Sequence, residues 1–210
     1  PKSAYRGQTG PLIVTDPMES NAFYASMFKG AEEIGIKRNP DYNAAQQDGV
    51  GMTQATIWRG KRQSTAVSYL HPIKKRKNLR ILTDTYVEKL ILQNNKCVGV
   101  ETTQKGTKVV VRSNCEVIIS AGAINSPQLL ELSGIGAENV LRKAGIEVKS
   151  ALPGVGENLR DHYAPRMKWS TLKGRYTYND RARGIGMALE IAKYFTAGSG
   201  FLAMPAAPMR

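Results

Sequence analysis

Alternating hydrophobic and polar positions in the middle of the chain predict three consecutive β-strands, over residues 87–93, 98–104 and 108–112. Side chains of a strand alternate between its two faces, so Val98 shares a face with Val100, and Val109 with Val111. The short segments between the strands contain the turn-forming residues Asn or Gly. The pattern therefore predicts an antiparallel β-meander.

A different hydrophobic pattern follows at residues 116–120, which read EVIIS. This compact apolar run is typical of a strand buried on both faces in a parallel sheet. Small residues come next, and then Asn125 or Ser126 is expected to cap a helix with Pro127 in its first turn. The apolar face of that helix would carry Leu129, Leu130 and Leu132.

Helical spacing of apolar residues predicts two further helices. The first would start at Ser20 or Asn21, run to Ile34 and end at Gly35, with its apolar stripe formed by Phe23, Met27, Ala31 and Ile34. The second covers residues 183–195, with Ile185, Leu189, Ala192 and Phe195 roughly on one face. Weaker signals predict strands over 12–15, 79–83 and 146–149, helices over 64–70 and 137–144, a turn over 153–156, and an irregular tail over 198–210. The fold class expected is mixed α/β.

Composition narrows the class of protein without naming it. With 210 residues, of which 41% are hydrophobic, the chain has the size of one globular domain or two small ones. No apolar run approaches the roughly 18 residues that a membrane-spanning helix needs. The two cysteines, Cys97 and Cys115, do not make a disulfide framework, so a reduced cytoplasmic protein is the default expectation. The start at Pro1, without a signal peptide, indicates processing or truncation.

The net charge of +13 comes from 30 basic and 17 acidic residues spread along the chain. Its densest run is Lys74-Lys75-Arg76-Lys77, which we interpret as a solvated helix end. An alternative is a basic protein that binds nucleic acid or an anionic surface. The run lacks the interleaved aromatic residues of a base-stacking platform, so no nucleic-acid partner is expected.

The junction between the 116–120 run and the following helix is the best candidate for a ligand site. Ligands of open α/β sheets bind beyond the carboxyl ends of strands, and helix N-termini favour phosphate. The small residues SAGA at 120–123 would let a dinucleotide approach the backbone closely. From the residues alone, the favoured interpretation is that the small residues only pack a tight strand-to-helix turn without a ligand.

Other candidate catalytic residues are weak. His71 precedes Pro72 and fits a helix end or a surface position. His162 follows Asp161, but adjacent side chains usually point apart, so the pair is a poor base with its orienting acid. Ser64 and Ser126 have no suitably spaced base, which argues against a hydrolase triad, and no metal-ligand cluster is expected.

Several segments resemble, in order, the motifs of the glucose–methanol–choline (GMC) flavoprotein oxidoreductases. Residues 120–136, SAGAINSPQLLELSGIG, are similar to the family's second signature, and residues 152–162, LPGVGENLRDH, to its LPGVGxNLxDH segment. Residues 60–72 resemble its GxRxSxxxxYL helix, residues 78–101 its NLxxxTxxxVxxL…GVE strands, and residues 5–12 its RGxxGPL segment. The similarity runs from about residue 5 to about 165, and bacterial choline dehydrogenase-like members look most similar.

The resemblance implies an FAD-dependent enzyme that oxidises a small alcohol, choline-like alcohols included, by hydride transfer to the flavin. Residues 1–165 would be an incomplete Rossmann-like FAD-binding domain that contains the meander, and residues 166–210 the start of a substrate domain or an irregular tail. Val87 matches the position whose backbone contacts the adenine in the family, and Ala121 and Gly122 match the strand end that lies against the FAD.

The same resemblance limits what this chain is expected to do alone. The family's N-terminal Gly-rich fingerprint and its C-terminal catalytic His have no counterpart here, so no catalytic residue is assigned and the isolated chain is expected to be inactive. A non-catalytic fold remnant is an alternative. The alcohol, the choice between oxidase and dehydrogenase, and the oligomeric state stay open, as does association of a cytoplasmic protein with a membrane.

Overall fold

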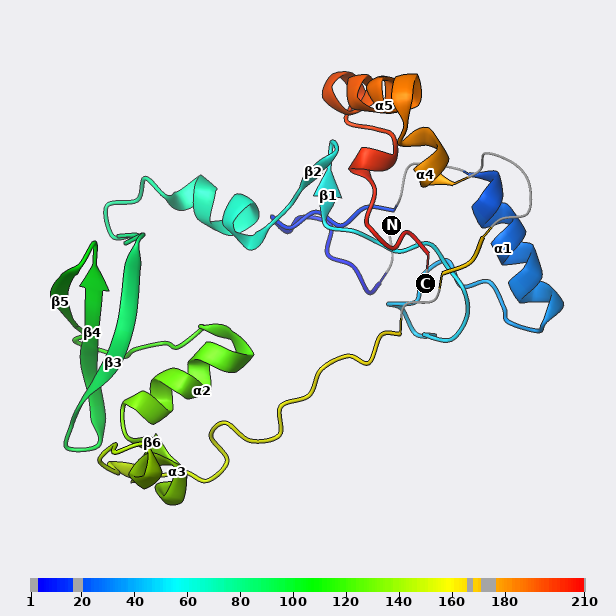
Figure 1. Cartoon of the computed structure of the whole chain (residues 1–210). Helices are drawn as coiled ribbons and strands as arrows, with labels where there is room; N and C mark the ends of the chain where they lie inside the picture. Colours follow the sequence, from blue (N-terminus) through cyan, green and yellow to red (C-terminus); the bar gives the residue numbers. More distant parts are fainter. Residues whose placement is uncertain (1–3, 17–20, 166–167, 171–176, 210) are drawn as a thin grey trace. The chain divides into compact units, whose positions relative to one another are not determined.

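The structure is a computed structural model, and it describes residues 4–16, 21–165, 168–170 and 177–209. The chain divides into two compact units (Figure 1). We call residues 1–80 with 169–210 the terminal unit, and residues 81–168 the central unit. The sequence predicted a boundary between residues 165 and 166 that separates an FAD-binding domain from a substrate domain or tail. The two compact units do not test these binding roles, so this boundary stays a prediction.

The central unit contains the predicted meander. Strands β3 (Thr85–Gln93), β4 (Lys96–Gln104) and β5 (Thr107–Arg112) form one antiparallel sheet in the order β3-β4-β5. Asn94 and Asn95 connect β3 to β4 with φ angles of 49° and 58°, the left-handed pair that two-residue hairpin turns require. The sequence-based prediction of this sheet and its turns is confirmed.

Helix α2 (Gly122–Leu132) packs against β3 and is tied to it by one fully buried serine. Ser133 Oγ accepts a hydrogen bond of 2.8 Å from the Leu90 backbone N–H and donates one of 2.6 Å to the Leu129 carbonyl. Helix α3 (Glu138–Lys143) supplies Leu141, which is also fully buried. Strands β6 (Ile135–Gly136) and β7 (Ser150–Ala151) form a short parallel pair.

Two predicted strands of this region are wrong. Residues 79–83 and 116–120 lie in no strand or bridge formed by the described residues. Ile118, in the middle of the second segment, is 78% exposed instead of buried. A strand exists only where a neighbouring strand takes up its backbone hydrogen bonds, and the described part of the chain offers these segments none.

Two boundaries also differ from prediction. Helix α2 starts at Gly122, so Asn125 and Ser126 lie inside it and Pro127 is its sixth residue, not part of its first turn. Ser126 still acts near the helix start, because its Oγ accepts a hydrogen bond of 3.1 Å from the Ala121 N–H. The strand expected over 146–149 occurs instead at Ser150–Ala151.

The first helix described in the terminal unit is α1 (Ala22–Glu33). Asn21 caps it by accepting a hydrogen bond from the Phe23 N–H. Ser20, the alternative cap, lies outside the described residues. The predicted stripe is wrong: Tyr24 and Phe28 are buried, whereas Met27 is 44% exposed. Tyr24 packs edge-on against Tyr178, and Arg38 lies over the Phe28 ring. These contacts bury residues that lie one position further along the chain than the predicted Phe23 and Met27.

A hairpin and a short helical segment follow in this unit. Strands β1 (Ile57–Trp58) and β2 (Lys61–Arg62) pair antiparallel, and then come π-helical η1 (Ala66–Leu70) and 3₁₀-helical η2 (His71–Ile73). The helix predicted over 64–70 is confirmed in place. Of the strand predicted over 12–15, only Thr15 pairs, in an isolated bridge with Ala55.

The last helices are α4 (Tyr178–Arg181), α5 (Gly184–Ala197) and η3 (Phe201–Ala203). The helix predicted over 183–195 exists, but its predicted face is wrong: Ile185 is 81% and Phe195 80% exposed, and the buried residue is Glu190. Gly198 caps the C-terminal end of α5, and its backbone lies against the β1–β2 turn. A Cβ at Gly198 would come within 2.6 Å of the Arg59 carbonyl oxygen.

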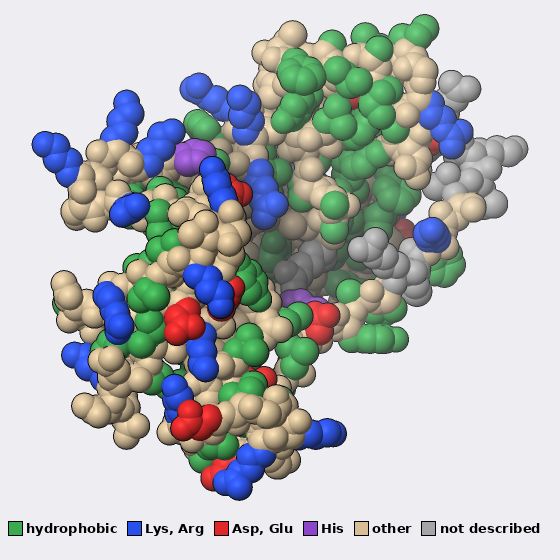
Figure 2. All heavy atoms as spheres, turned by 60° about the vertical axis from the view of Figure 1, so that its left-hand side comes forward, with side chains coloured by type: hydrophobic (Ala, Val, Ile, Leu, Met, Phe, Trp, Pro, Cys, Tyr) green, Lys and Arg blue, Asp and Glu red, His purple; other side chains and the backbone are tan. Residues whose placement is uncertain are grey.

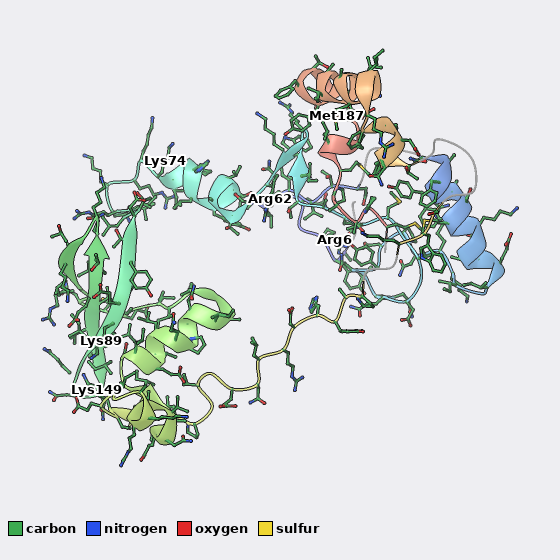
Figure 3. The ribbon with its side chains drawn as sticks, viewed as in Figure 1. Arg6, Arg62, Lys74, Lys89, Lys149 and Met187 are labelled. Atoms are coloured by element: carbon green, nitrogen blue, oxygen red, sulfur yellow. The ribbon has the colours of Figure 1, made fainter. Side chains whose placement is uncertain are left out.

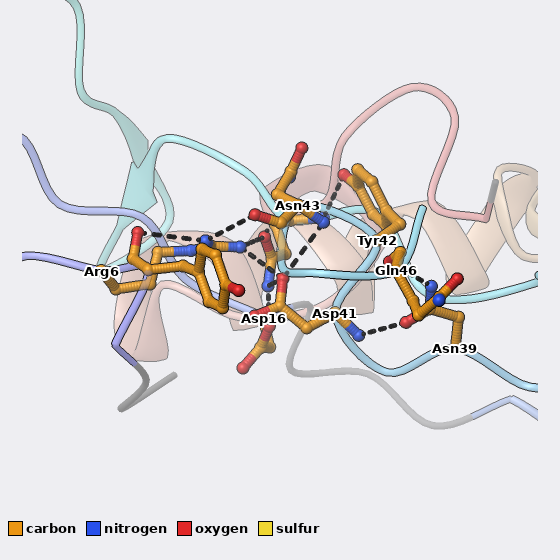
Figure 4. A network of polar contacts seen from close by, with 9 residues as sticks. Arg6, Asp16, Asn39, Asp41, Tyr42, Asn43 and Gln46 are labelled. Carbon is orange, nitrogen blue, oxygen red and sulfur yellow. Dashed lines mark hydrogen bonds and ion pairs between the residues drawn. The ribbon is translucent and has the colours of Figure 1, made fainter. Parts of the chain in front are cut away.

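A polar network joins the start of the chain to residues 39–54 of the same unit (Figure 4). Arg6 pairs with Asp41 and donates a hydrogen bond of 2.8 Å to Gln54 Oε1. The Gln54 backbone N–H donates in turn to the Tyr42 hydroxyl at 3.1 Å. Arg6 belongs to the RGxxGPL-like segment at residues 5–12. Its side chain connects this segment to the loops that carry Asp41 and Gln54.

Candidate cofactor-binding site

A hollow of about 410 Å³ opens in the central unit where β3 begins and α2 starts. Three parts of the chain surround it: the edge strand β3 with Val100 of β4, the segment 117–120, and one face of α2. Its lining consists of Thr85, Tyr86, Val87, Leu90, Val100, residues 117–121, Asn125, Gln128, Leu129 and Leu132.

The sequence brings two of its three predicted cofactor residues to this hollow. Val87 from β3 and Ala121 from the start of α2 both line it, although 34 positions separate them in the chain. Gly122 follows directly but does not belong to the lining. Contact of any of the three with a cofactor stays a prediction.

Gly122 has a conformational role at the start of the helix. Its φ angle is 91°, a left-handed value that residues with a Cβ seldom adopt. A Cβ added at Gly122 would meet no atom within 4 Å, so backbone conformation, not crowding by the described residues, explains the glycine. The open space leaves the backbone at the start of α2 accessible.

The helix face that lines the hollow was only partly predicted, because Leu129 and Leu132 were expected on the apolar face but the amides Asn125 and Gln128 were not. Asn125, Gln128, Leu129 and Leu132 are spaced at i, i+3, i+4 and i+7, which places them on one side of α2. That spacing was readable in the sequence, but the predicted helix began too late to include Asn125 in its body. The two amides add hydrogen-bonding groups to walls that are otherwise mostly aliphatic.

The chemistry of the lining suits binding and not proton transfer. None of the described residues that surround the hollow is Asp, Glu, His, Lys, Arg or Cys. Strand β3 is an edge strand of its sheet, so backbone groups on its outer side are not taken up by another strand of the described chain. Aliphatic walls beside a strand edge fit a flat, uncharged heteroaromatic group that hydrogen-bonds to backbone.

Other residues considered for chemistry lie elsewhere. His71 and His162 are exposed, and Asp161 accepts a hydrogen bond from the backbone N–H of His162, not from its ring. Ser64 and Ser126 each accept a hydrogen bond from a backbone N–H, at Val67 and Ala121, which are structural roles. Both cysteines are free, and no group of three or more potential metal ligands occurs in the described part of the chain.

A second hollow, of about 550 Å³, lies within the terminal unit. Trp58, Arg59 and Gly60 of the β1–β2 hairpin line it together with Arg181, Lys193 and the residues that follow α5. No residue that the sequence predicts to bind cofactor lines this hollow. Among the described helices, none has the length and apolar character to cross a membrane.

Comparison with known proteins connects these features to one family. The sequence profile described as GMC oxidoreductase matches residues 2–164. The oxygen-dependent choline dehydrogenase of Staphylococcus xylosus is 45% identical over 158 residues, which cover 75% of this chain and 28% of that protein. The mitochondrial choline dehydrogenase of Homo sapiens is 42% identical over 160 residues, covering 76% of this chain and 27% of that protein.

The fold is also that of solved flavoenzymes. An FAD-dependent oxidoreductase from Chaetomium thermophilum superposes with a TM-score of 0.82 at 24% identity, over 94% of this chain and 35% of the other. This likeness concerns the fold alone. The chain spans less than a third of the length of the curated relatives that it matches. On the profile match over residues 2–164, the chain belongs to the GMC oxidoreductase family.

Proposed function

We propose that this chain forms the adenine-side wall of the FAD site in a flavoenzyme that oxidises a small alcohol, with a choline-like alcohol as substrate. The cofactor of the family is FAD. The single observation that supports the proposal most strongly is that Val87 and Ala121 line one uncharged hollow beside a strand edge. The substrate proposal rests on the choline dehydrogenases among the relatives.

The residues of the hollow fit the adenine end of FAD. In the proposed arrangement the backbone of β3 at Val87 hydrogen-bonds the adenine edge, and the aliphatic side chains of Leu90 and Leu129 pack against its faces.

Bound FAD supplies the hydride acceptor for oxidation of a CH–OH donor. The described residues of the hollow contribute binding, orientation and exclusion of water, because none of them is an acid or base near neutral pH. The group that removes the hydroxyl proton is therefore sought outside this hollow. The cytoplasmic location and the lack of a nucleic-acid partner stay predictions.

The test compares a substitution that fills the hollow with the same substitution two residues away, outside the hollow. In the full-length protein that carries this sequence, Ala121→Leu adds three carbons to the lining, whereas Ala123→Leu makes the same change outside it. Both alanines are exposed, so neither change overpacks a core. Overpacking a close-fitting ligand site costs about 1–3 kcal/mol, which predicts an FAD affinity about tenfold weaker or more for Ala121→Leu.

Flavin absorbance of the purified proteins and titration of apoprotein with FAD measure the effect. We expect Ala123→Leu to match the unmodified protein in both assays. Full FAD occupancy and unchanged affinity in Ala121→Leu would contradict the placement of the cofactor in this hollow. Loss of affinity in both variants would show a general disturbance of α2 and would equally count against the proposed site.

A further inference from the structure

One stretch of the terminal unit carries positive charge without any compensating acid. Between Asp48 and Asp84 the sequence has eight Lys and Arg residues and no Asp or Glu. We call residues 58–80 the basic segment. Its cations are Arg59, Lys61, Arg62, Lys74, Lys75, Arg76, Lys77 and Arg80, and all eight are exposed. None of them forms an ion pair with a residue that the structure describes.

The strongest concentration of charge lies in a tight loop. Lys74 follows the last residue of η2, and two successive turns shape the loop: Arg76 N–H donates to the Ile73 carbonyl at 2.9 Å, and Leu79 N–H to the Arg76 carbonyl at 3.1 Å. Figure 3 shows Arg62 and Lys74 at the two ends of the short helical segment η1–η2. Like charges held this close repel one another, and an anionic surface relieves that repulsion.

Exposed amphipathic side chains accompany the charges. Trp58 is 45% and Tyr69 48% exposed, and Val67 between them is 38% exposed. The Arg59 guanidinium lies 5.7 Å from the centre of the Trp58 ring. Trp and Tyr, with an apolar ring and a polar group, are the side chains that settle at the headgroup level of a bilayer.

We propose that the basic segment is a docking surface for an anionic phospholipid membrane. Juxtaposed Lys and Arg residues draw such a segment to acidic headgroups, and Trp58 and Tyr69 add apolar contact at the interface. This is peripheral attachment and requires no membrane-spanning helix.

Nucleic acid fits the same charges less well. Duplex readout places a helix or a two-stranded ribbon in a groove, but η1 and η2 are only five and three residues long. Single-strand binding needs successive aromatic platforms, and Trp58 and Tyr69 are separated by ten residues. A fluid anionic surface sets no such geometric requirement.

The test compares two sets of three lysines in the full-length protein. The first variant is Lys74→Gln, Lys75→Gln and Lys77→Gln together. The matched control is Lys96→Gln, Lys105→Gln and Lys108→Gln in the meander, with Lys96 at the start of β4, Lys105 in the β4–β5 turn and Lys108 in β5. All six lysines are exposed, so both variants lose the same charge from the surface. The control removes charge from a sheet that also carries acidic residues, Glu88 on β3 and Glu101 on β4. Figure 2 shows acidic side chains among the basic ones in its lower part.

Co-sedimentation with vesicles of phosphatidylcholine, with and without phosphatidylserine, measures binding. We expect the protein to bind the anionic vesicles, to bind less at high salt, and not to bind pure phosphatidylcholine. Each lysine near an anionic leaflet contributes about 1 kcal/mol, so the first variant should bind on the order of 100-fold more weakly. The control variant should bind like the unmodified protein, and FAD content should be equal in all three.

Three results would overturn the proposal. Equal loss in both variants would show that only the overall charge matters. Equal binding to uncharged vesicles would remove the role of anionic lipid. Tighter binding to single- or double-stranded nucleic acid than to anionic vesicles, lost in the first variant, would assign the basic segment to the other class of partner.

Discussion

Glu190 is a carboxylate in the interior of the terminal unit, and its partners explain why it is tolerated there. Its side chain is 3% exposed, pairs with Arg181, accepts a hydrogen bond of 2.9 Å from Lys193, and accepts another of 3.1 Å from the Phe201 N–H. Burial raises the pKa of this carboxyl, but the hydrogen bonds from Arg181, Lys193 and Phe201 outweigh it and lower the pKa from 4.5 to about 2. One side chain thus joins α4, α5 and η3.

We predict that Glu190→Gln lowers the free energy of unfolding by about 3 kcal/mol at neutral pH, since it leaves two cations without their carboxylate. The effect depends on pH with a defined sign. The folded pKa of about 2 lies below the ordinary value of 4.5, so the stabilisation is present above pH 4.5 and is lost as the pH falls toward 2. Denaturant unfolding of both proteins at several pH values measures it.

The matched control for this prediction is Glu138→Gln. Glu138 pairs with Arg142 at 3.0 Å across one turn of α3, but the two side chains are 53% and 72% exposed. Exposed pairs of this kind contribute roughly 0–1 kcal/mol, so we expect a change below about 0.5 kcal/mol. A difference between Glu190→Gln and the unmodified protein that stays constant from pH 7 to pH 2 would contradict the assigned role.

At the scale of elements, the sequence predicted what local interactions determine. The meander was correct because Asn94-Asn95 encodes a hairpin turn and its flanking strands find partners a few residues away. The run at 116–120 was wrong because a parallel strand depends on distant segments, and no described residue pairs with it. The faces of α1 and α5 were wrong because both helices are apolar on more than one side, so tertiary partners choose which side is buried.

The contact between α5 and the β1–β2 hairpin gives a prediction about one element against another. Gly198 has a φ angle of 59°, and a Cβ there would lie 2.6 Å from the Arg59 carbonyl oxygen. Gly198→Ala should therefore destabilise the protein by about 2 kcal/mol or more, from a left-handed alanine and a backbone clash. Thermal or denaturant unfolding of the variant measures the loss.

Gly30→Ala is the matched control, with the opposite expected sign. Gly30 lies inside α1, its φ angle is not positive, and a Cβ there would meet no atom within 4 Å. Alanine in a helix interior is more favourable than glycine by about 1 kcal/mol, so this variant should gain stability. If Gly198→Ala were as stable as the unmodified protein, the close packing of α5 on the hairpin would be refuted.

At the scale of the whole molecule, the candidate site was predictable only in part. The motif at 120–136 indicated the cofactor class, and the hollow does bring Val87 and Ala121 together. The amide pair Asn125 and Gln128 was missed because the start of α2 was predicted four or five residues too late. The sequence motifs could not predict the other residues that would enclose a cofactor. Those contacts depend on tertiary packing between distant segments, which local sequence patterns do not specify.

Large apolar side chains stay exposed in the described parts of both units. Ile118 is 78%, Ile124 69%, Leu159 68%, Ile185 81% and Phe195 80% exposed. Exposed apolar residues at this density mark surfaces that another part of a protein covers. The 116–120 segment in addition keeps backbone hydrogen-bonding groups that no strand of the described chain takes up.

We therefore predict that these 210 residues alone neither retain FAD nor oxidise choline, whereas the full-length protein does both. In the proposed arrangement the hollow of about 410 Å³ forms one side of an adenine site, and none of its described residues is an acid or base near neutral pH, so affinity and turnover both require groups from elsewhere. Flavin absorbance after gel filtration and a choline-dependent dye-reduction assay, run on both proteins at equal concentration, measure the two properties. Binding of a hydrophobic fluorescent dye should be stronger for the 210 residues alone, because their apolar surface is uncovered. Stoichiometric FAD with choline turnover by the 210 residues alone would show that this chain holds a complete site, and the assignment of the hollow to one wall of a larger site would then be wrong.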